Sequence, residues 1–449
     1  MDTAVERTTT RSWPAALVLA GAMFLVLFDS LAVATALPAI GAEFAVPPEH
    51  LQWVVTLYSL SIGGFLLLGG RVCDLWGRRR LIVASLGVTA AGLLLSGVAS
   101  ATAPLLAGRV LQGLGAAFAI PATLASAATL FPGEPWRSRV FSVVAAAGNT
   151  AGVAGAVFGG LITSSLGWRW IFLVVVPVAV LAGVAALLVL PKDEPAAERP
   201  RRLDLIGAVL ATGGILGVIY GATQLGERGL GPVAVLPVVV GLVLLAALVF
   251  RERRVADPLI KPSVVRSRRL VASCVAFLAH CAAYSAVIVV SSLLLQDVHG
   301  LSAAQAGLML APLLVGSFVS SVPAGPLLRR YGTRRVVTCC LTFSSITLAL
   351  VAMAGRESLV LVSIALILWG LSSGPVFVAL TRECVGDAAP ADRGIASALF
   401  ESTSHIGGAI SVAVYLTLVG AGLGYGTAQL VGAAIVGAAV VPTLLIMPK

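Results

Sequence analysis

The sequence carries little charge for its length. Asp, Glu, Lys and Arg make up 11% of its 449 residues, whereas 58% of the residues are hydrophobic. A soluble domain carries about 25% charged residues. Apolar runs of about 20 residues, the length that crosses a bilayer as a helix, recur along the whole chain. The shortage of charge therefore argues against a soluble protein and predicts an all-α polytopic membrane protein.

Cysteines in outward-facing segments and the common catalytic motifs are also missing. None of the six cysteines lies in a segment that we expect to face the outside, so no disulfide framework is predicted. The sequence contains no Walker phosphate loop, no HExxH pattern and no Cys/His spacing typical of a metal site. These absences argue against ATP-driven pumping and metal catalysis. We expect no enzyme, no cofactor and no metal, and a proton gradient as the energy source.

The sequence does contain fourteen stretches with the length and hydropathy of membrane spans. The predicted spans are 14–40, 51–70, 81–100, 104–128, 139–165, 168–190, 204–224, 232–250, 269–295, 303–326, 335–354, 358–380, 393–419 and 427–447. With the amino terminus inside, 26 of the 30 Lys and Arg residues lie in cytoplasmic loops, tails or span edges. Arg169, Arg228 and Arg356 lie outside, and Arg109 lies within a span.

Because loops rich in Lys and Arg stay on the cytoplasmic side, this asymmetry predicts that both termini are cytoplasmic. The net charge of +10 then reflects these loops and not a nucleic-acid partner. Arg outnumbers Lys by 27 to 3 in a chain rich in Ala, Gly and Val, which suggests a bacterial protein of the inner membrane. We expect a monomer.

The two ends of the chain resemble each other at a steady offset. "GRVCDLWGRRR" begins at Gly70 and "GPLLRRYGTRR" begins at Gly325, an offset of 255. Segments 112–121 and 369–378 match at an offset of 257, and the segments at Arg139 and Arg393 match at 254. The sequence therefore predicts two related six-helix bundles. The predicted domains are 1–190, 269–449 and, between these bundles, linkers plus an inserted two-helix hairpin at 191–268. Such repeats are a transporter architecture with the substrate site near the membrane midplane.

Asp29 stands in the apolar stretch "LVLFDSLAVATALPAI" (25–40). At 1.5 Å per residue, Asp29 lies about 22 Å from the inner face and Arg109 about 8 Å from the outer face. In a hydrocarbon core about 30 Å thick, the two charges share one depth. A lone intramembrane carboxylate costs about 2.5–3.5 kcal/mol, so a paired Arg would lower that cost. The pair could break and form with protonation, or it could be a static ion pair. Either reading allows Asp29 to recognise a cationic substrate.

Glu401 and His405 lie four residues apart in the predicted thirteenth span, so they share one helix face. Glu401 is about 12 Å from the cytoplasmic end of that span, deep in the membrane. Acids within a membrane are functional candidates by default, and His titrates near physiological pH. The two residues could form a proton relay, bind a polar substrate, or make a hydrogen-bonded packing pair between helices.

Glycines mark two further segments. In "GRVCDLWGRRR", Gly70 and Gly77 allow close helix packing and a tight turn, and Asp74 could cap a helix. The residues that follow, Arg78, Arg79 and Arg80, belong at the cytoplasmic headgroups. In the predicted fifth span, small residues form one face that lets helices approach closely, to seal or hinge the two bundles or simply to pack. The glycines of this face are Gly148, Gly152, Gly155, Gly159 and Gly160.

Several of these segments together resemble one family, the major facilitator superfamily, and within it the fourteen-span drug:proton antiporters. The segments that carry the resemblance are "GRVCDLWGRRR" (70–80), "FDSLAVATALP" (28–38), "WVVTLYSL" (53–60), "LAGRVLQGLGAAFAIP" (106–121), "GNTAGVAGAVFGG" (148–160) and "LGWRWIF" (166–172). The resemblance implies alternating access by rocking of two halves. It also implies that Asp74 and the three following arginines stabilise one state at the cytoplasmic gate.

The sequence departs from the family pattern at three places. Ala156 follows Gly155 where the family usually has a Gly-Pro pair, and Val175 replaces a usual Asn. Glu401 and His405 stand where Asn and Gln are more usual. The third departure predicts altered proton or substrate chemistry in the second half.

The resulting hypothesis is a proton-coupled exporter of small amphipathic compounds such as drugs or antibiotics. Its partners would be that small molecule, protons and the lipid bilayer. A proton symporter that imports a nutrient and a non-transporting receptor on the same scaffold remain alternatives. Trp53, Tyr58 and Gln112 are candidates to line the substrate cavity. His280 and Tyr284, again four residues apart, are two more. By the repeat, Tyr284 is the counterpart of Asp29, although His280 could equally be a satisfied core histidine.

Overall fold

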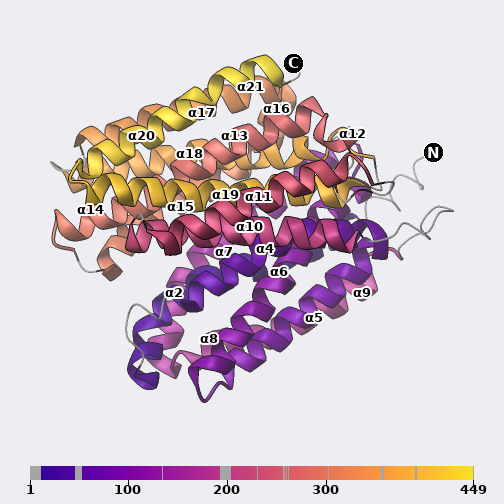
Figure 1. Ribbon diagram of the computed structural model, residues 1–449, viewed down its shortest axis with the longest axis horizontal. Helices are drawn as coiled ribbons and strands as arrows, with labels where there is room; N and C mark the ends of the chain where they lie inside the picture. The colour runs from indigo at the N-terminus through magenta and orange to yellow at the C-terminus, as the bar shows by residue number, and fades with distance from the viewer. Residues whose placement is uncertain are drawn as a thin grey trace. The chain divides into compact units, whose positions relative to one another are not determined.

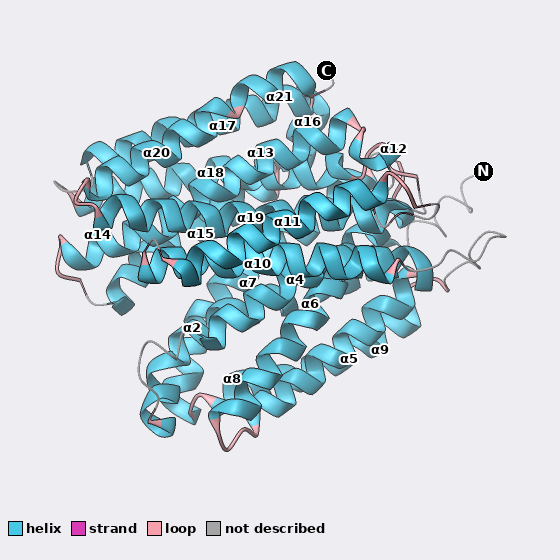
Figure 2. Ribbon diagram, in the orientation of Figure 1, coloured by secondary structure: helices cyan, strands magenta, loops and turns pink. Residues whose placement is uncertain are grey.

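The computed structural model describes residues 12–45, 53–133, 135–192, 204–229, 231–255, 258, 260, 262–301, 303–354, 358–389 and 392–447. Every regular element in these ranges is a helix (Figure 2). The all-α class expected from the apolar runs is therefore confirmed. The chain divides into two compact units, one made of residues 1–208 and 389–398, the other of residues 209–388 and 399–449.

The first unit contains the helices that carry Asp29 and Arg109. Its helices are α2 (Ser12–Phe44), α4 (Trp53–Trp76), α5 (Arg78–Gly97), α6 (Thr102–Leu130), α7 (Trp136–Leu166), α8 (Arg169–Leu173) and α9 (Val175–Val189). Helix α2 packs along α7, and α6 packs against both α4 and α5 (Figure 1). Gly77, with a φ of 94°, provides the sharp turn between α4 and α5, a conformation that suits glycine.

The second unit contains most of the remaining helices. They are α10 (Leu205–Arg228), α11 (Pro232–Glu252), α12 (Pro262–Val265), α13 (Arg268–Ser285), the π-helix η1 (Ala286–Val290), α14 (Ser291–Asp297), α15 (Ala303–Ser321), α16 (Ala324–Tyr331), α17 (Thr333–Ala354), α18 (Leu359–Cys384), α19 (Arg393–Gly420), α20 (Gly424–Ala438) and α21 (Val440–Ile446). The first residues of α10 and α19 belong to the first unit.

Helices α10 and α11 lie in the segment where the sequence predicts an inserted hairpin, and they pack against one another. A Cβ at Gly217 would lie 2.8 Å from the backbone oxygen of Pro237, and one at Gly241 would lie 2.6 Å from that of Gly214. Because real Cβ atoms do not approach so closely, these glycines let the two helices touch along their backbones. The hairpin is thus an internally packed element, and it clusters with the second unit from residue 209 onward.

Among the described residues, eleven helices are long and apolar enough to cross a membrane, or twelve if one bent pair counts as a span. The bent pair is α15 and α16, which meet at an angle of 56°. The sequence predicts one span over 303–326, but α15 ends at Ser321 and α16 begins at Ala324. Pro323 lies at this break, and a proline lacks the N–H that would continue the α15 hydrogen-bond ladder.

Candidate functional site

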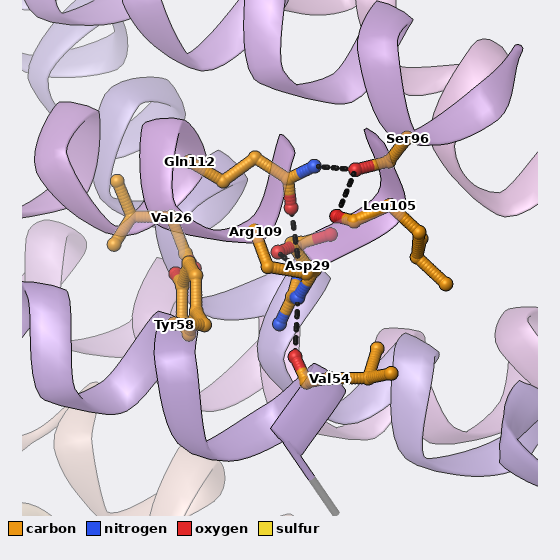
Figure 3. Close-up of polar contacts among 8 residues, drawn as sticks. All are labelled: Val26, Asp29, Val54, Tyr58, Ser96, Leu105, Arg109 and Gln112. Carbon is orange, nitrogen blue, oxygen red and sulfur yellow. Dashed lines mark hydrogen bonds and ion pairs between the residues drawn. The ribbon is translucent and has the colours of Figure 1, made fainter. Parts of the chain in front are cut away.

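The pair expected from the depth of two charges exists in the first unit. Arg109 on α6 donates a hydrogen bond and forms an ion pair with Asp29 on α2 (Figure 3). Asp29 is 3% exposed and Arg109 is fully buried. A single buried charge carries a large desolvation penalty, and the attraction between the two opposite charges offsets part of it.

The guanidinium of Arg109 is fixed by three further contacts. Its Nε donates to the backbone oxygen of Val54, 2.8 Å away, and the side-chain oxygen of Gln112 accepts from Nη1. The guanidinium also lies 4.4 Å from the centre of the Tyr58 ring, which provides a cation–π attraction. Tyr58 in turn donates its hydroxyl to the backbone oxygen of Val26 on α2. Two cavity candidates, Tyr58 and Gln112, therefore belong to the shell that orients Arg109.

Trp53, the third candidate of the first half, lies at the first residue of α4, directly before Val54. The amide of Gln112 donates to Ser96 on α5 at 2.9 Å, and Ser96 donates to the backbone oxygen of Leu105 at 3.5 Å. This chain of hydrogen bonds links the buried arginine to a third helix (Figure 3).

Glycines on α6 let the arginine sit at this depth. A Cβ at Gly108 would lie 2.2 Å from the Ser96 hydroxyl, and one at Gly113 would lie 2.6 Å from the backbone oxygen of Tyr58. Helix α6 can approach α4 and α5 this closely only because these positions lack side chains. The segment "LAGRVLQGLGAAFAIP" thus encodes both the buried charge and the close packing that holds it.

The pair has spare capacity for a proton. Within the described residues, Oδ1 of Asp29 and Nη2 of Arg109 are buried and have no hydrogen-bond partner in the protein. An ionised carboxylate accepts on both oxygens, and a protonated one donates from one of them. The arrangement can therefore hold a carboxylate bound to arginine through one oxygen, with the other oxygen free to take up a proton.

Asp74 makes the helix cap that its position in the motif suggested, but on a distant helix. Its two carboxylate oxygens accept from the backbone N–H groups of Gly394 and Ile395, at 2.9 and 3.0 Å. These N–H groups belong to the first turn of α19, where a negative charge is stabilised. Gly70 lies against this turn, since a Cβ there would meet the Gly394 oxygen at 2.5 Å.

Arg393 adds a second connection between the start of α19 and the first unit. It donates to the backbone oxygen of Ala128, 3.0 Å away, and to the Thr129 hydroxyl, 2.9 Å away. Both acceptors lie in the last turns of α6, where backbone carbonyls favour a cation. Sequence reasoning used Arg393 to align the repeats and missed this role. The arginines that follow Gly77 lie in the first turn of α5, where Arg79 donates to the backbone oxygen of Leu187.

The glycine face of α7 contacts α2 at its inner end. A Cβ at Gly148 would lie 2.9 Å from Leu27 and 3.7 Å from Met23, two residues on the same helix as Asp29. Gly152, Gly155 and Gly159 are buried. Gly160 does not share this close packing, because a Cβ there would have no atom within 4 Å in the described structure.

A second polar and aromatic cluster lies in the second unit. His280 on α13 is 3% exposed, its Nε2 lies 2.9 Å from the Ser373 hydroxyl on α18, and its ring stacks on Trp369 at 5.2 Å. Tyr284 lies 5.6 Å from the same indole. His280 is therefore packed as a core residue, but only its Nε2 is hydrogen-bonded, because its buried Nδ1 has no partner among the described residues. Trp369 is a member of the cluster that sequence reasoning did not select.

Glu401 reaches the same helix from α19. Phe400, directly before Glu401, stacks on Phe277 of α13 with ring centres 4.1 Å apart. Glu401 is 8% exposed, and His405 is partly exposed. The described residues give the Glu401 carboxylate no hydrogen-bond or ion-pair partner, and it is not bonded to His405. A buried acid without a counter-charge is a costly feature in a membrane.

These long apolar helices with buried charge are those of a multi-pass helical membrane protein. The chain belongs to the Major Facilitator Superfamily, whose family model matches residues 19–411 and 272–449. The family resemblance noted in the sequence motifs is thereby confirmed, and the family is one of transporters and not of enzymes. The chain is a multi-pass membrane protein related to bacterial exporters.

Two curated relatives indicate the branch of the family. The chain is 36% identical over 436 residues to the cephamycin export protein CmcT of Amycolatopsis lactamdurans, covering 95% of this chain and 89% of the relative. It is 35% identical over 418 residues to the puromycin resistance protein pur8 of Streptomyces alboniger, covering 91% and 82%. The fold is similar to that of the human organic anion transporter MFSD10, with a TM-score of 0.70, 19% identity and coverage of 97% and 98%.

Proposed function

We propose that this protein is a proton-coupled exporter of small amphipathic compounds, such as drugs or antibiotics. The observation that carries the proposal is the buried pair of Asp29 and Arg109, which lies in a chain similar to an antibiotic exporter and an antibiotic resistance protein. Eleven helices of the described residues, or twelve with the bent pair, are long and apolar enough to span a membrane, and we propose that α2 and α7 are two further spans, which gives fourteen. Both termini face the cytoplasm, in line with the positive-inside distribution of its basic residues.

The coupling step is the exchange of Arg109 for a proton on Asp29. While the pair is formed, the carboxylate is stabilised by a full positive charge beside it. When the two helices separate, a buried carboxylate without that charge is far more stable in its neutral form. A proton from outside then binds Asp29, while Arg109 keeps the Val54 oxygen and the Tyr58 ring. Each transport cycle therefore moves a proton inward as the compound moves outward.

The cytoplasmic gate is formed by Asp74 and Arg393. Their hydrogen bonds hold the start of α19 against α4 and α6 within the first unit. Access from the cytoplasm requires release of these contacts. Because each of these hydrogen bonds has one charged partner, each is worth about 1.5–3 kcal/mol, which a transport cycle can break.

Everted vesicles test the direction of transport. Acidification of the vesicle lumen should drive accumulation of an exported compound inside the vesicle, and a protonophore should abolish that accumulation. A growth-inhibition panel in a pump-deficient host, repeated with the protonophore, selects the compound to use. Loss of preloaded compound on acidification would identify an importing symporter instead, and saturable binding without any flux would identify a receptor.

Glu401 is a second candidate for proton or substrate chemistry. We expect the Glu401→Gln variant to shift the pH dependence of efflux or to narrow the range of compounds exported, because the amide keeps the shape of the side chain but cannot ionise. The measurement is efflux over a pH series for a cationic, a neutral and an anionic compound. The matched control is Glu383→Gln, since Glu383 lies on α18 near the Arg269 and Arg382 guanidinium groups. Unchanged pH dependence and unchanged range would leave Glu401 with a structural role only.

A further inference from the structure

A cavity of about 780 Å³ lies in the second unit, between the α16–α17 turn and α21. Its lining combines charge with apolar surface. The residues that matter here are Leu327, Tyr331, Arg334, Arg335, Cys339 and Leu444. None of them belongs to the cluster of His280, Trp369 and Glu401, so the cavity is separate from that candidate transport site.

Two guanidinium groups of this cavity have no acidic neighbour to neutralise them. In the described part of the chain, the side chains of Arg334 and Arg335 make no hydrogen bond and no ion pair. The acid beside the start of α17 is Glu383, which accepts from the Thr333 hydroxyl at 2.9 Å. Glu383 also lies 3.6 Å from Arg382 and 3.9 Å from Arg269. Its charge is therefore offset outside the cavity.

The backbone adds to the positive character of the cavity. Arg334 and Arg335 lie in the first turn of α17, where unpaired N–H groups and the helix dipole favour an anion. Gly332, with a φ of 79°, turns the chain sharply so that the end of α16 meets this turn. The positive charge of the cavity lining itself comes from Arg334 and Arg335.

The other wall of the cavity is apolar and continues outside it. Leu327 and Leu444 line it, and helices α17 and α21 carry exposed apolar side chains further along. On α17 Ile346 is 54% exposed, and on α21 Leu445 is 78% exposed. In a protein that spans a bilayer, such residues face hydrocarbon. A ligand that fits both parts has an anionic head and apolar chains.

We propose that this cavity binds an anionic phospholipid, with the headgroup phosphate against Arg334 and Arg335 and the acyl chains along α17 and α21. Basic pockets at the charged end of membrane helices suit such headgroups, and arginine matches phosphate in a bidentate geometry. The site lies at the end of the helices that the basic loops place in the cytoplasm. The anionic lipids of the inner leaflet are therefore the ligand within reach.

The test counts bound lipid on the purified full-length protein. Native mass spectrometry is carried out in detergent micelles that contain dioleoyl phosphatidylglycerol, dioleoyl phosphatidylcholine or inorganic phosphate alone. We expect phosphatidylglycerol to be retained in preference to phosphatidylcholine, and the R334A/R335A variant to need about tenfold more of it for half-saturation. The R334K/R335K variant, which keeps both charges, should lose less.

Two further variants test whether the loss is specific to the two arginines and whether the apolar wall takes part in lipid binding. R253A/R254A also removes two exposed basic residues from this unit, but from positions outside the cavity lining, and it should stay within about twofold of the parent. L444W keeps both arginines and fills the apolar wall, and it should weaken retention. Equal retention by the parent and R334A/R335A would overturn the proposal, as would an equal loss in R253A/R254A. Displacement of the lipid by inorganic phosphate at the same concentration would assign the site to a free phosphate compound.

Discussion

The Asp29→Asn variant is expected to reach the membrane in normal amount and to lose proton-driven export completely. Asparagine has nearly the shape of aspartate and can still accept a hydrogen bond from Arg109, so the packing of α2 against its neighbours should survive. It cannot take up and release a proton, however, and the energy of the gradient can no longer enter the cycle. The measurement is uphill efflux in energised cells and in everted vesicles, normalised to protein in the membrane.

Exchange without a gradient separates coupling from binding in this variant. If Asp29 only carries protons, Asp29→Asn should still exchange labelled for unlabelled compound across vesicles at equal pH. Asp387→Asn is the matched control, because Asp387 is an exposed acid paired with Arg269 at 3.3 Å and should leave efflux unchanged. Uphill efflux that persists in Asp29→Asn would remove this residue from the coupling mechanism. Loss of exchange as well would place Asp29 in substrate binding.

The Arg109→Ala variant is expected to be strongly destabilised. It leaves Asp29 buried without a counter-charge and removes the donor to Val54 and the cation on Tyr58. Breaking a buried ion pair from one side costs about 3–5 kcal/mol. We expect a lower amount of the variant in the membrane and a lower temperature of thermal aggregation in detergent, measured by size-exclusion chromatography after heating.

A double-mutant cycle identifies the cause of that loss. The Asp29→Asn/Arg109→Ala variant has no uncompensated buried charge, and we expect it to recover a large part of the stability lost in Arg109→Ala while remaining inactive in export. The coupling energy between the two sites follows from the four stabilities. A double variant no more stable than Arg109→Ala would show that packing around the guanidinium, and not its charge, stabilises the unit. Arg254→Ala, at an exposed position on a loop, serves as the control for loss of an arginine.

The positions of the helices were largely accessible from the sequence, because the bilayer imposes one strong constraint. A membrane-spanning helix is apolar for about 20 residues, and charged residues follow where it leaves the bilayer. The ends of α17 and α18, for example, lie close to the predicted limits of 335–354 and 358–380. The length of an apolar run does not show whether the helix bends or breaks within the span. The break between α15 and α16 depends on whether neighbouring helices tolerate a bend at Pro323, and that is a property of packing.

The shared depth of Asp29 and Arg109 was predictable for a different reason. The depth of a residue in the membrane follows from its position along the span, because each helical residue advances by a fixed rise. Contacts that depend on which helix faces which are not accessible in this way. The Asp74 cap on Gly394 joins residues 320 positions apart, and the stacking of His280 on Trp369 requires the orientation of two helices. Sequence reasoning therefore found the residues of the second cluster in part and its geometry not at all.

The glycines of α6 have a mechanical consequence for the first unit. Where Gly108 and Gly113 bring backbones together, sliding of α6 would drive main-chain atoms into one another, so we expect α4, α5 and α6 to move together. Helix α2 meets this block at the pair through the Arg109 guanidinium and the Tyr58 hydroxyl, which can rotate away. We therefore infer that, in the proposed coupling step, Arg109 keeps its place on α6 while α2 moves and carries Asp29 with it.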